Sequence, residues 1–251
     1  MARVLLAGES WISQATHFKG FDSFTSVTFH TGADNFIAAA AQEGIEVEQM
    51  FAHDVPAKFP RTVDAMAAYD VILLSDIGTN SFLLPPETWL EGKRSDNPLV
   101  SLAQWTRAGG GLMMAGGYLS FQGFQARANF VRSPIAEVLP VTMLEGDDRA
   151  EVPQGAACAL TATGHPIAAS WTGTAPDLLG YNIVQAKPEA DVVATVNDDV
   201  LIATMAVAEG RSLVWTSDIG PHWCPDDFVH WEGFAPVVGA MLRWLGAGTS
   251  A

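Results

Sequence analysis

Short apolar runs that end at glycine or aspartate mark the first half of the chain. Such runs are typical of strands that are buried on both faces. They lie at Val4–Ala7, Asp70–Asp76 and Leu112–Ala115. Helices are predicted between them, at Asn35–Gly44, Thr62–Tyr69 and Leu99–Ala108. Strands that alternate with helices in this way predict a parallel sheet.

The second half carries shorter strand patterns and one closing helix. Strands are predicted at Gly180–Val184, Asp191–Val196, Leu201–Val207 and Ser212–Asp218. A helix is predicted at Phe234–Leu245, before a Gly/Ser/Ala tail that we expect to fray. An alternating strand near an edge is predicted at Ile45–Met50. We therefore expect an α/β protein whose residues 1–251 form one domain: a flavodoxin-like, doubly wound, mostly parallel sheet with helices on both faces and a β-rich extension.

Several segments lack clear periodicity. Glu9–Phe24 mixes polar and aromatic residues, and we interpret it as a long loop with a short helix. Gln122–Pro134 is predicted as a loop with two arginines, suited to a lid or a partner contact. Short helical pieces are predicted in Pro85–Lys93 and at Ile135–Leu139. Pro140–Pro153 is expected to be extended and holds the acidic residues Glu145, Asp147, Asp148 and Glu151.

Composition narrows the range of partners. The 251 residues carry a net charge of −15, which repels phosphate backbones and anionic membranes, so we expect neither nucleic-acid nor membrane binding. Two cysteines provide no disulfide framework. The apolar run at Val4–Ala7 is too short for a signal-peptide core. These features favour a cytoplasmic protein, and a homo-oligomer, with a dimer as the default, is expected.

Glycines flank the strand at Leu112–Ala115. Gly109-Gly110-Gly111 precede it, and Gly116-Gly117-Tyr118 follow it. Glycine is needed where φ is positive or where the backbone passes close to another group. The pattern predicts a tight turn that holds one side chain above the sheet edge, as in the elbows that carry nucleophiles. Tyr118 occupies that position.

Familiar cofactor motifs are missing. No Gly-x-Gly-x-x-Gly follows a strand and opens a helix, and there is no P-loop, so we expect no nucleotide cofactor. His222 and Cys224 are two residues apart, but no further Cys/His pair at ligand spacing completes a metal site. Cys158 is most simply a core residue. We expect neither a cofactor nor a metal.

Acidic residues follow three predicted strands. Glu9 follows the first, and Asp76 and Asp218 lie in two copies of the tetrapeptide Ser-Asp-Ile-Gly, at Ser75–Gly78 and Ser217–Gly220. Functional residues gather at the carboxyl edge of parallel sheets, where such acids bind polar ligands or act as bases. Serine and aspartate also favour helix caps and turns, so a purely structural role is equally consistent with the pattern.

His222 and several aromatic residues also fall near predicted strand ends. His222 lies just past the last strand, as either a site residue or a structural histidine. His17 and His165 are expected in loops. The aromatic side chains either line a small-molecule pocket or pack the loops down; they are Trp11, Phe21, Phe24, Trp215 and Trp223.

These motifs together carry a resemblance to a known family. The segments are Gly8-Glu9-Ser10-Trp11, Lys19-Gly20-Phe21-Asp22-Ser23-Phe24, Ser75-Asp76-Ile77-Gly78, Gly109-Gly110-Gly111-Leu112, Gly116-Gly117-Tyr118-Leu119-Ser120-Phe121, Leu179-Gly180-Tyr181-Asn182 and Thr216-Ser217-Asp218-Ile219-Gly220-Pro221-His222-Trp223. Over nearly the whole chain the sequence resembles the class I glutamine amidotransferase-like family, in a subfamily that lacks the catalytic cysteine.

The resemblance implies a nucleophile elbow of the form Gly-x-Cys-x-Gly and a later His-x-Glu. In this chain Tyr118 stands where the cysteine belongs, and Cys224 stands where the glutamate after His222 belongs. A phenol is a poor nucleophile for a glutamine amide. We therefore expect no glutaminase activity.

The first hypothesis is a hydrolase that acts on an amide or related non-peptide C–N bond of a small polar metabolite. Tyr118 and His222 act in it as a proton donor and acceptor, with Glu9 or Asp218 as orienter or base. The expected substrate-binding residues are Gly116, Gly117, Ser10, Trp11, Asp76, Gly78 and Trp223. Tyr118 is equally consistent with a structural aromatic that caps the sheet edge. The alternatives are a degenerate, non-catalytic member that binds a small ligand or protein partner, and an oligomeric scaffold joined through the aromatic loops.

Overall fold

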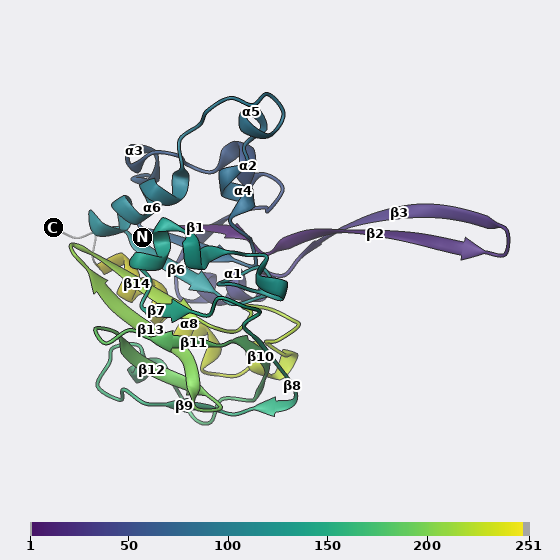
Figure 1. Cartoon of the computed structure of the whole chain (residues 1–251). Helices are drawn as coiled ribbons and strands as arrows, with labels where there is room; N and C mark the ends of the chain where they lie inside the picture. The colour runs from purple at the N-terminus through teal and green to yellow at the C-terminus, as the bar shows by residue number, and fades with distance from the viewer. Residues whose placement is uncertain (1, 248–251) are drawn as a thin grey trace.

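A sheet of eight strands forms the centre of the protein, in the order β4-β1-β5-β6-β14-β13-β12-β9 (Figure 1). The computed structural model describes residues 2–247. The sheet strands are β1 (Arg3–Gly8), β4 (Glu46–Met50), β5 (Val71–Ser75), β6 (Gly111–Ala115), β9 (Cys158–Leu160), β12 (Asp191–Val196), β13 (Asp199–Val207) and β14 (Gly210–Trp215). The strands from β4 to β14 in this order run parallel, and β13, β12 and β9 continue the sheet in antiparallel pairing.

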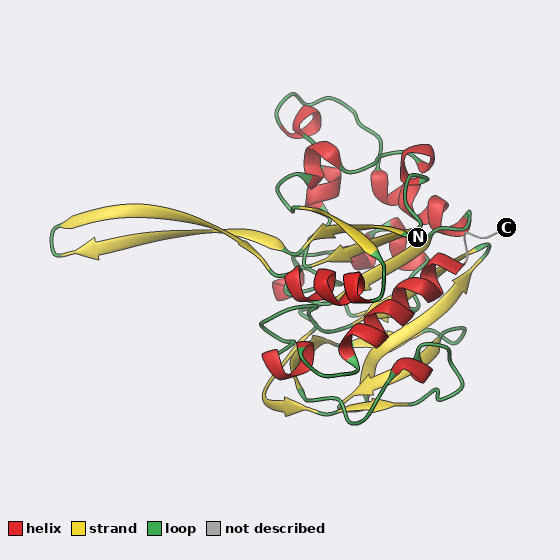
Figure 2. Cartoon of the chain, turned by 180° about the vertical axis from the view of Figure 1, so that it is seen from behind, coloured by secondary structure: helices red, strands yellow, loops and turns green. Residues whose placement is uncertain are grey.

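Helices cover both faces of the sheet, and each face has its own hydrophobic core (Figures 1 and 2). One face packs against α1 (Asp34–Gln42), α7 (Asp226–Val229) and α8 (Phe234–Gly246). The other packs against α2 (Val55–Lys58), α3 (Val63–Met66), α4 (Asn80–Leu83) and α6 (Pro98–Arg107), with α5 (Pro86–Trp89) outside this core. The predicted mixed α/β architecture around a large, mostly parallel sheet is confirmed.

Short strands and 3-10 helices form the remainder of the second half. β7 (Val141–Met143) pairs with β11 (Val184–Ala186), and β8 (Arg149–Ala156) pairs with β10 (Leu178–Asn182). The strand predicted at Gly180–Val184 is thus divided between two pairs. The 3-10 helices are η1 (Phe124–Ala126), η2 (Phe130–Arg132), η3 (Pro134–Glu137) and η4 (Ala168–Ser170). No helix of residues 2–247 is long and apolar enough to cross a membrane. Residues 248–251 of the tail expected to fray lie outside the described residues.

The prediction of a long loop with a short helix at Glu9–Phe24 is wrong. Residues in this region form a long antiparallel hairpin, β2 (Ser10–Lys19) and β3 (Asp22–Thr31), which projects from the body of the protein (Figures 1 and 2). Its strands are rich in threonine and in aromatic and β-branched residues, which favour extended backbone. Gly20 has φ +67° at the first central position of the two-residue turn, the position where tight hairpins require glycine.

Gly116 allows two strand ends to meet closely after β6. Its N–H donates to the backbone oxygens of Trp215 and Ser217, at 2.7 and 2.9 Å. A Cβ atom at this position would overlap the backbone oxygen of Thr216. The predicted tight turn therefore depends on the absence of a side chain at residue 116.

We expect Gly116→Ala to destabilise the protein by about 2–3 kcal/mol, because the new methyl group must push the end of β14 away from β6. Gly146→Ala is the matched control, since a Cβ there meets no atom within 4 Å. The measurement is the free energy of unfolding in urea. Equal free energies for the two variants would contradict this view of the turn.

Candidate active site

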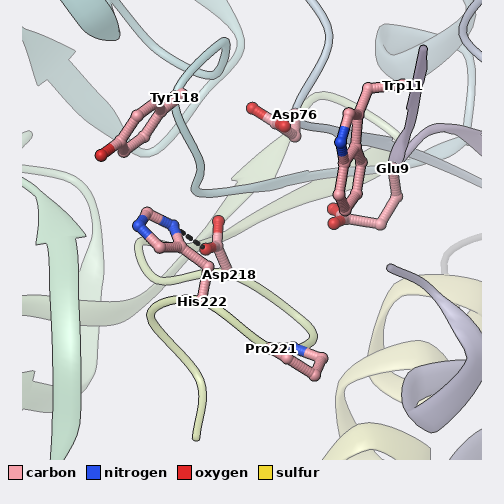
Figure 3. Close-up of a pocket in the computed structure, with 7 residues that line it drawn as sticks. All are labelled: Glu9, Trp11, Asp76, Tyr118, Asp218, Pro221 and His222. Carbon is pink, nitrogen blue, oxygen red and sulfur yellow. Dashed lines mark hydrogen bonds and ion pairs between the residues drawn. The ribbon is translucent and has the colours of Figure 1, made fainter. Parts of the chain in front are cut away.

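The carboxyl ends of neighbouring strands bring Glu9, Asp76 and Asp218 around one cavity (Figure 3). Glu9 follows β1, Asp76 follows β5, and Asp218 lies three residues past β14. The cavity has a volume of about 300 Å³. Its wall consists of Glu9, Trp11, Asp76, Tyr118, Asp218, Pro221 and His222. Three acids that are far apart in the sequence are therefore neighbours at the edge that the sheet topology predicts for a site.

Glu9 is almost fully buried, with 5% of its surface exposed. Its backbone takes φ +48°, and its N–H donates to the backbone oxygen of Ser75 at 2.8 Å. The Ser75 hydroxyl donates to Oε2 of Glu9 at 2.6 Å. Burial, and then the negative charges of Asp76 and Asp218, raise the pKa of Glu9 to about 8. The Glu9 side chain is thus largely a neutral acid at pH 7.

Asp76 has the same backbone conformation at the end of the neighbouring strand, with φ +43°. Leu119 N–H donates to Asp76 Oδ1 at 2.7 Å, and Asp76 N–H donates to the Ser120 hydroxyl at 3.0 Å. Burial raises the pKa of Asp76 to about 6, with a further contribution from the charge of Asp218 and against the lowering effect of the Leu119 hydrogen bond. At pH 7 Asp76 is therefore mostly a carboxylate beside a protonated Glu9.

Asp218 and His222 form a pair on the third side of the cavity. His222 Nδ1 lies 3.1 Å from Asp218 Oδ2, and Trp223 N–H donates to the same oxygen at 3.1 Å. The hydrogen bond to Asp218 raises the pKa of His222, against the effect of its partial burial. His222 has φ +137°, so an unusual backbone conformation holds the ring in place.

Gly117 lies between two of the acids. A Cβ at residue 117 would lie 2.8 Å from Asp76 Oδ1 and 3.0 Å from Asp218 Oδ1, so the glycine makes room for both carboxyl groups. Its N–H donates to Oδ1 of the buried Asn182 at 3.0 Å. The left-handed φ of this turn, +138°, falls on Gly117 and not on Tyr118. Tyr118 therefore follows the strained position of the elbow.

The phenol of Tyr118 is directed away from the acids. Its hydroxyl donates to Glu151 Oε1 at 3.0 Å, and burial followed by this hydrogen bond raises its pKa. The Tyr118 ring meets the His222 ring edge-on, with centroids 4.8 Å apart, and the Arg149 guanidinium lies 4.7 Å from the Tyr118 centroid. The structure thus brings Tyr118 and His222, the predicted proton donor and acceptor, together through their rings, while the Tyr118 hydroxyl bonds to Glu151.

The other expected binding residues Ser10, Gly78 and Trp223 do not line the cavity. The Ser10 hydroxyl accepts a hydrogen bond from Ala52 N–H at 2.8 Å, and Gly78 packs against the backbone of Ala128. Trp223 is buried and donates from Nε1 to Glu151 Oε2 at 3.0 Å. Of the aromatic candidates only Trp11 lines the cavity. Phe21 and Phe24 are exposed on the hairpin, and Trp215 lies in the core.

The acidic segment before β8 holds the backbone at Gln122 and Gly123, a role that sequence reasoning missed. The buried Asp148 accepts hydrogen bonds from Gln122 N–H at 2.9 Å, Gly123 N–H at 2.8 Å and Asn182 Nδ2 at 2.8 Å. The start of the segment predicted as a lid is therefore anchored. Pro221, which lines the cavity, was also missed. The acidic cluster and the Tyr181-Asn182 motif are visible in the sequence, but neither one shows that Asp148 bonds to Asn182 and to the backbone after Tyr118.

Neither cysteine supplies a reactive thiol. Burial raises the pKa of Cys158 to about 12 and that of Cys224 well above its ordinary value. Neither residue lines the cavity. Among residues 2–247, no group of three or more His, Cys, Asp or Glu side chains is placed to hold a metal ion. The side chains that line the cavity supply three carboxyl groups, one imidazole and two aromatic rings.

Fold and site together define an α/β protein with an acidic cavity at the carboxyl ends of its parallel strands. The sequence model of the family described as "Putative glutamine amidotransferase" matches residues 3–247. The chain belongs to this family, as the motifs indicated. No curated protein matches the sequence.

Two solved structures from Salmonella are similar along their whole length. The cytoplasmic protein STM3548 from Salmonella typhimurium has 40% identity and a TM-score of 0.92, with 96% of this chain and 98% of that chain covered. The cytoplasmic protein STM1381 from Salmonella typhimurium LT2 has 42% identity and a TM-score of 0.91, with 97% and 99% covered. A structure described as a "Putative thua-like protein" from Bacteroides uniformis ATCC 8492 shares the fold, at 10% identity and a TM-score of 0.56, with 97% of this chain and 91% of that chain covered.

The raised pKa of Glu9 predicts a pH-dependent stability. An unfolded glutamate ionises near pH 4.5, whereas folded Glu9 holds its proton to about pH 8, so the folded state binds more protons within this window. Stability is therefore lost as the pH rises through the window, by at most about 1.4 kcal/mol per pH unit. We expect urea titrations between about pH 5 and pH 8 to show a smaller loss for Glu9→Gln than for the wild-type chain. Parallel curves would show that Glu9 ionises normally.

Proposed function

We propose that the chain is a cytoplasmic hydrolase that cleaves a C–N bond of a small polar metabolite without a cysteine nucleophile. The observation that carries this proposal is the pairing of a protonated Glu9 with an ionised Asp76 in one cavity near neutral pH. Two acids whose environments separate their pKa values are the usual acid and base of a hydrolytic site. The name "cytoplasmic protein" carried by both Salmonella relatives supports the location.

Each carboxyl group has a definite task in this reaction. Asp76 takes a proton from a water molecule as the water oxygen attacks the carbon. Glu9 gives its proton to the departing nitrogen as the C–N bond breaks, and the two groups then exchange the proton through solvent to restore the starting state. Asp218, held by His222 and Trp223 N–H, contributes negative charge beside the reacting carbon.

The electrostatics favour a substrate whose transition state becomes positively charged. Amide hydrolysis builds an oxyanion, which needs free hydrogen-bond donors. The N–H groups of Glu9, Asp76 and Gly117 already donate to protein oxygens. A cavity lined by three acids instead stabilises the cationic carbon that forms when an N-glycosidic bond breaks, and carboxyl pairs perform the related cleavage of O-glycosides. We therefore favour an N-glycosidic C–N bond over an amide.

A non-catalytic receptor for a small organic cation is the second candidate. The three acids and the Trp11 ring would hold an ammonium group by charge and by contact with the aromatic face. Such a receptor would bind amines and show no turnover.

Turnover assays on a panel of N-glycosides, followed by mass spectrometry, test the proposal. We expect Glu9→Gln and Asp76→Asn each to lower kcat/KM by about 100-fold or more, because each removes one proton-transfer group. Tyr118→Phe is the matched control and should stay within about threefold, since its hydroxyl bonds to Glu151.

The pH profile of kcat/KM should rise as Asp76 ionises near pH 6 and fall as Glu9 loses its proton near pH 8. Loss of the alkaline limb in Glu9→Gln would support its role as the acid. Turnover that survives in both carboxyl variants would rule out the acid and base assigned here. Binding of simple amines without any turnover would favour the receptor.

A further inference from the structure

The hairpin formed by β2 and β3, called the arm below, has a composition unlike the rest of the chain. Residues 10–18 and 23–31 contain no Asp, Glu, Lys or Arg, whereas 16% of the whole chain is charged. Its only formally charged residues, Lys19 and Asp22, flank the turn at the tip. An uncharged ribbon that projects from a protein of net charge −15 is poorly suited to remain in water.

Both faces of the arm present apolar or aromatic side chains. The register pairs Ile12 with Phe29 and Gln14 with Val27, so these four share one face with Phe18. Ile12, Val27 and Phe18 are 57%, 67% and 78% exposed. On the opposite face the rings of Trp11 and His30 stack at 5.0 Å, and those of His17 and Phe24 stack at 4.6 Å. Neither face is covered by its own chain along most of its length.

The arm also has two free edges. Exposed strand edges are normally protected by charged residues, proline or bulges, because unpaired N–H and C=O groups invite pairing with another chain. Residues 10–31 contain no proline, and the ladder from Ser10–Thr31 to Lys19–Asp22 is regular. A two-stranded hairpin of this kind is at best marginally stable by itself. The arm therefore requires a surface to pack on.

The body of the same chain carries a complementary apolar surface. The large apolar side chains that are exposed outside the arm, within residues 2–247, are Leu83, Leu84, Trp89, Leu90, Val100, Tyr118 and Leu119. Most of them belong to α4, α5 and their ends, which we call the ledge (Leu83, Leu84, Trp89 and Leu90). Trp89 and Leu90 are 70% and 75% exposed. The arm of the same chain extends away from the body and leaves the ledge uncovered (Figures 1 and 2).

We propose that the arm packs on the ledge of a second copy of this chain, and that the second copy returns the same contact in a two-fold dimer. Each chain carries one arm and one ledge, so two chains can exchange the same contact, as a self-complementary two-fold interface requires. Charge favours this pairing on the side of the arm, because two chains of net charge −15 approach more easily through strands without acidic side chains. Two glutamates lie beside the ledge: Glu87 in α5, and Glu91, which pairs with Lys93.

The dimensions suit a stable dimer. A ten-residue strand spans about 33 Å, and a ribbon of two strands is about 10 Å wide with its side chains. Two such arms are each covered on one face and on part of the other. The area they bury is comparable to the roughly 800 Å² per partner of specific interfaces. Trp11 belongs both to the arm and to the cavity wall, so association also fixes one side of the cavity.

Light scattering and sedimentation of the full chain across the micromolar range test the proposal. We expect a dimer for the wild-type chain, and Val27→Asp in the arm or Trp89→Asp in the ledge should raise its dissociation constant by at least ~30-fold. Val100→Asp, an exposed apolar site on α6 outside both surfaces, is the matched control and should leave the dimer intact. Far-UV circular dichroism and thermal melting establish that each variant is folded.

A mixing experiment identifies the receptor. When Val27→Asp and Trp89→Asp chains are mixed, one intact arm meets one intact ledge, so dimers should return at concentrations where each variant alone is monomeric. A monomeric wild-type chain would overturn the proposal, as would a dimer that Val27→Asp leaves intact. A dimer that dissociates with Val27→Asp but not with Trp89→Asp would overturn the ledge as the receptor.

Discussion

Three carboxyl groups cannot all be charged in one small, half-buried space. Glu9, Asp76 and Asp218 surround a cavity of about 300 Å³, and each ionisation makes the next more costly. Glu9 is buried and faces the charges of both aspartates, so its pKa is raised to about 8 and it remains protonated near neutral pH. The division of the site into a proton donor and a proton acceptor follows first from burial and then from this repulsion. The proposed chemistry depends on it.

The sheet creates this crowding through its backbone. Parallel strands end at a common edge, and Glu9 and Asp76 leave that edge with positive φ, which turns both side chains toward the same space. Gly117 has no side chain and so leaves room for the carboxyl groups of Asp76 and Asp218. Asn182 holds the turn by accepting a hydrogen bond from Gly117 N–H. The residues that seemed to form a nucleophile elbow thus make room for acids. Tyr118 follows the turn as a wall residue whose hydroxyl serves Glu151.

The sequence allowed the parallel part of the fold to be predicted because buried strands leave continuous apolar runs, as at Val4–Ala7 and Leu112–Ala115. The same topology placed Glu9, Asp76 and Asp218 at one edge. The arm was missed because neither of its faces is buried, so its polar and aromatic residues follow no clear period, although Gly20 at the tip was a hairpin signal. The direction of the Tyr118 hydroxyl was beyond reach, since it depends on Glu151, which comes from a different strand pair.

The protonation of Glu9 near neutral pH is the claim on which the account of the site rests. It can be measured directly in the wild-type chain by carbon-detected NMR titration of glutamate side chains labelled at the carboxyl carbon, with Glu9→Gln identifying the resonance. We expect the Glu9 signal to titrate near pH 8. A signal that titrates near its ordinary value of 4.5 would contradict it, because both proposed proton-transfer groups would then carry the same charge at pH 7.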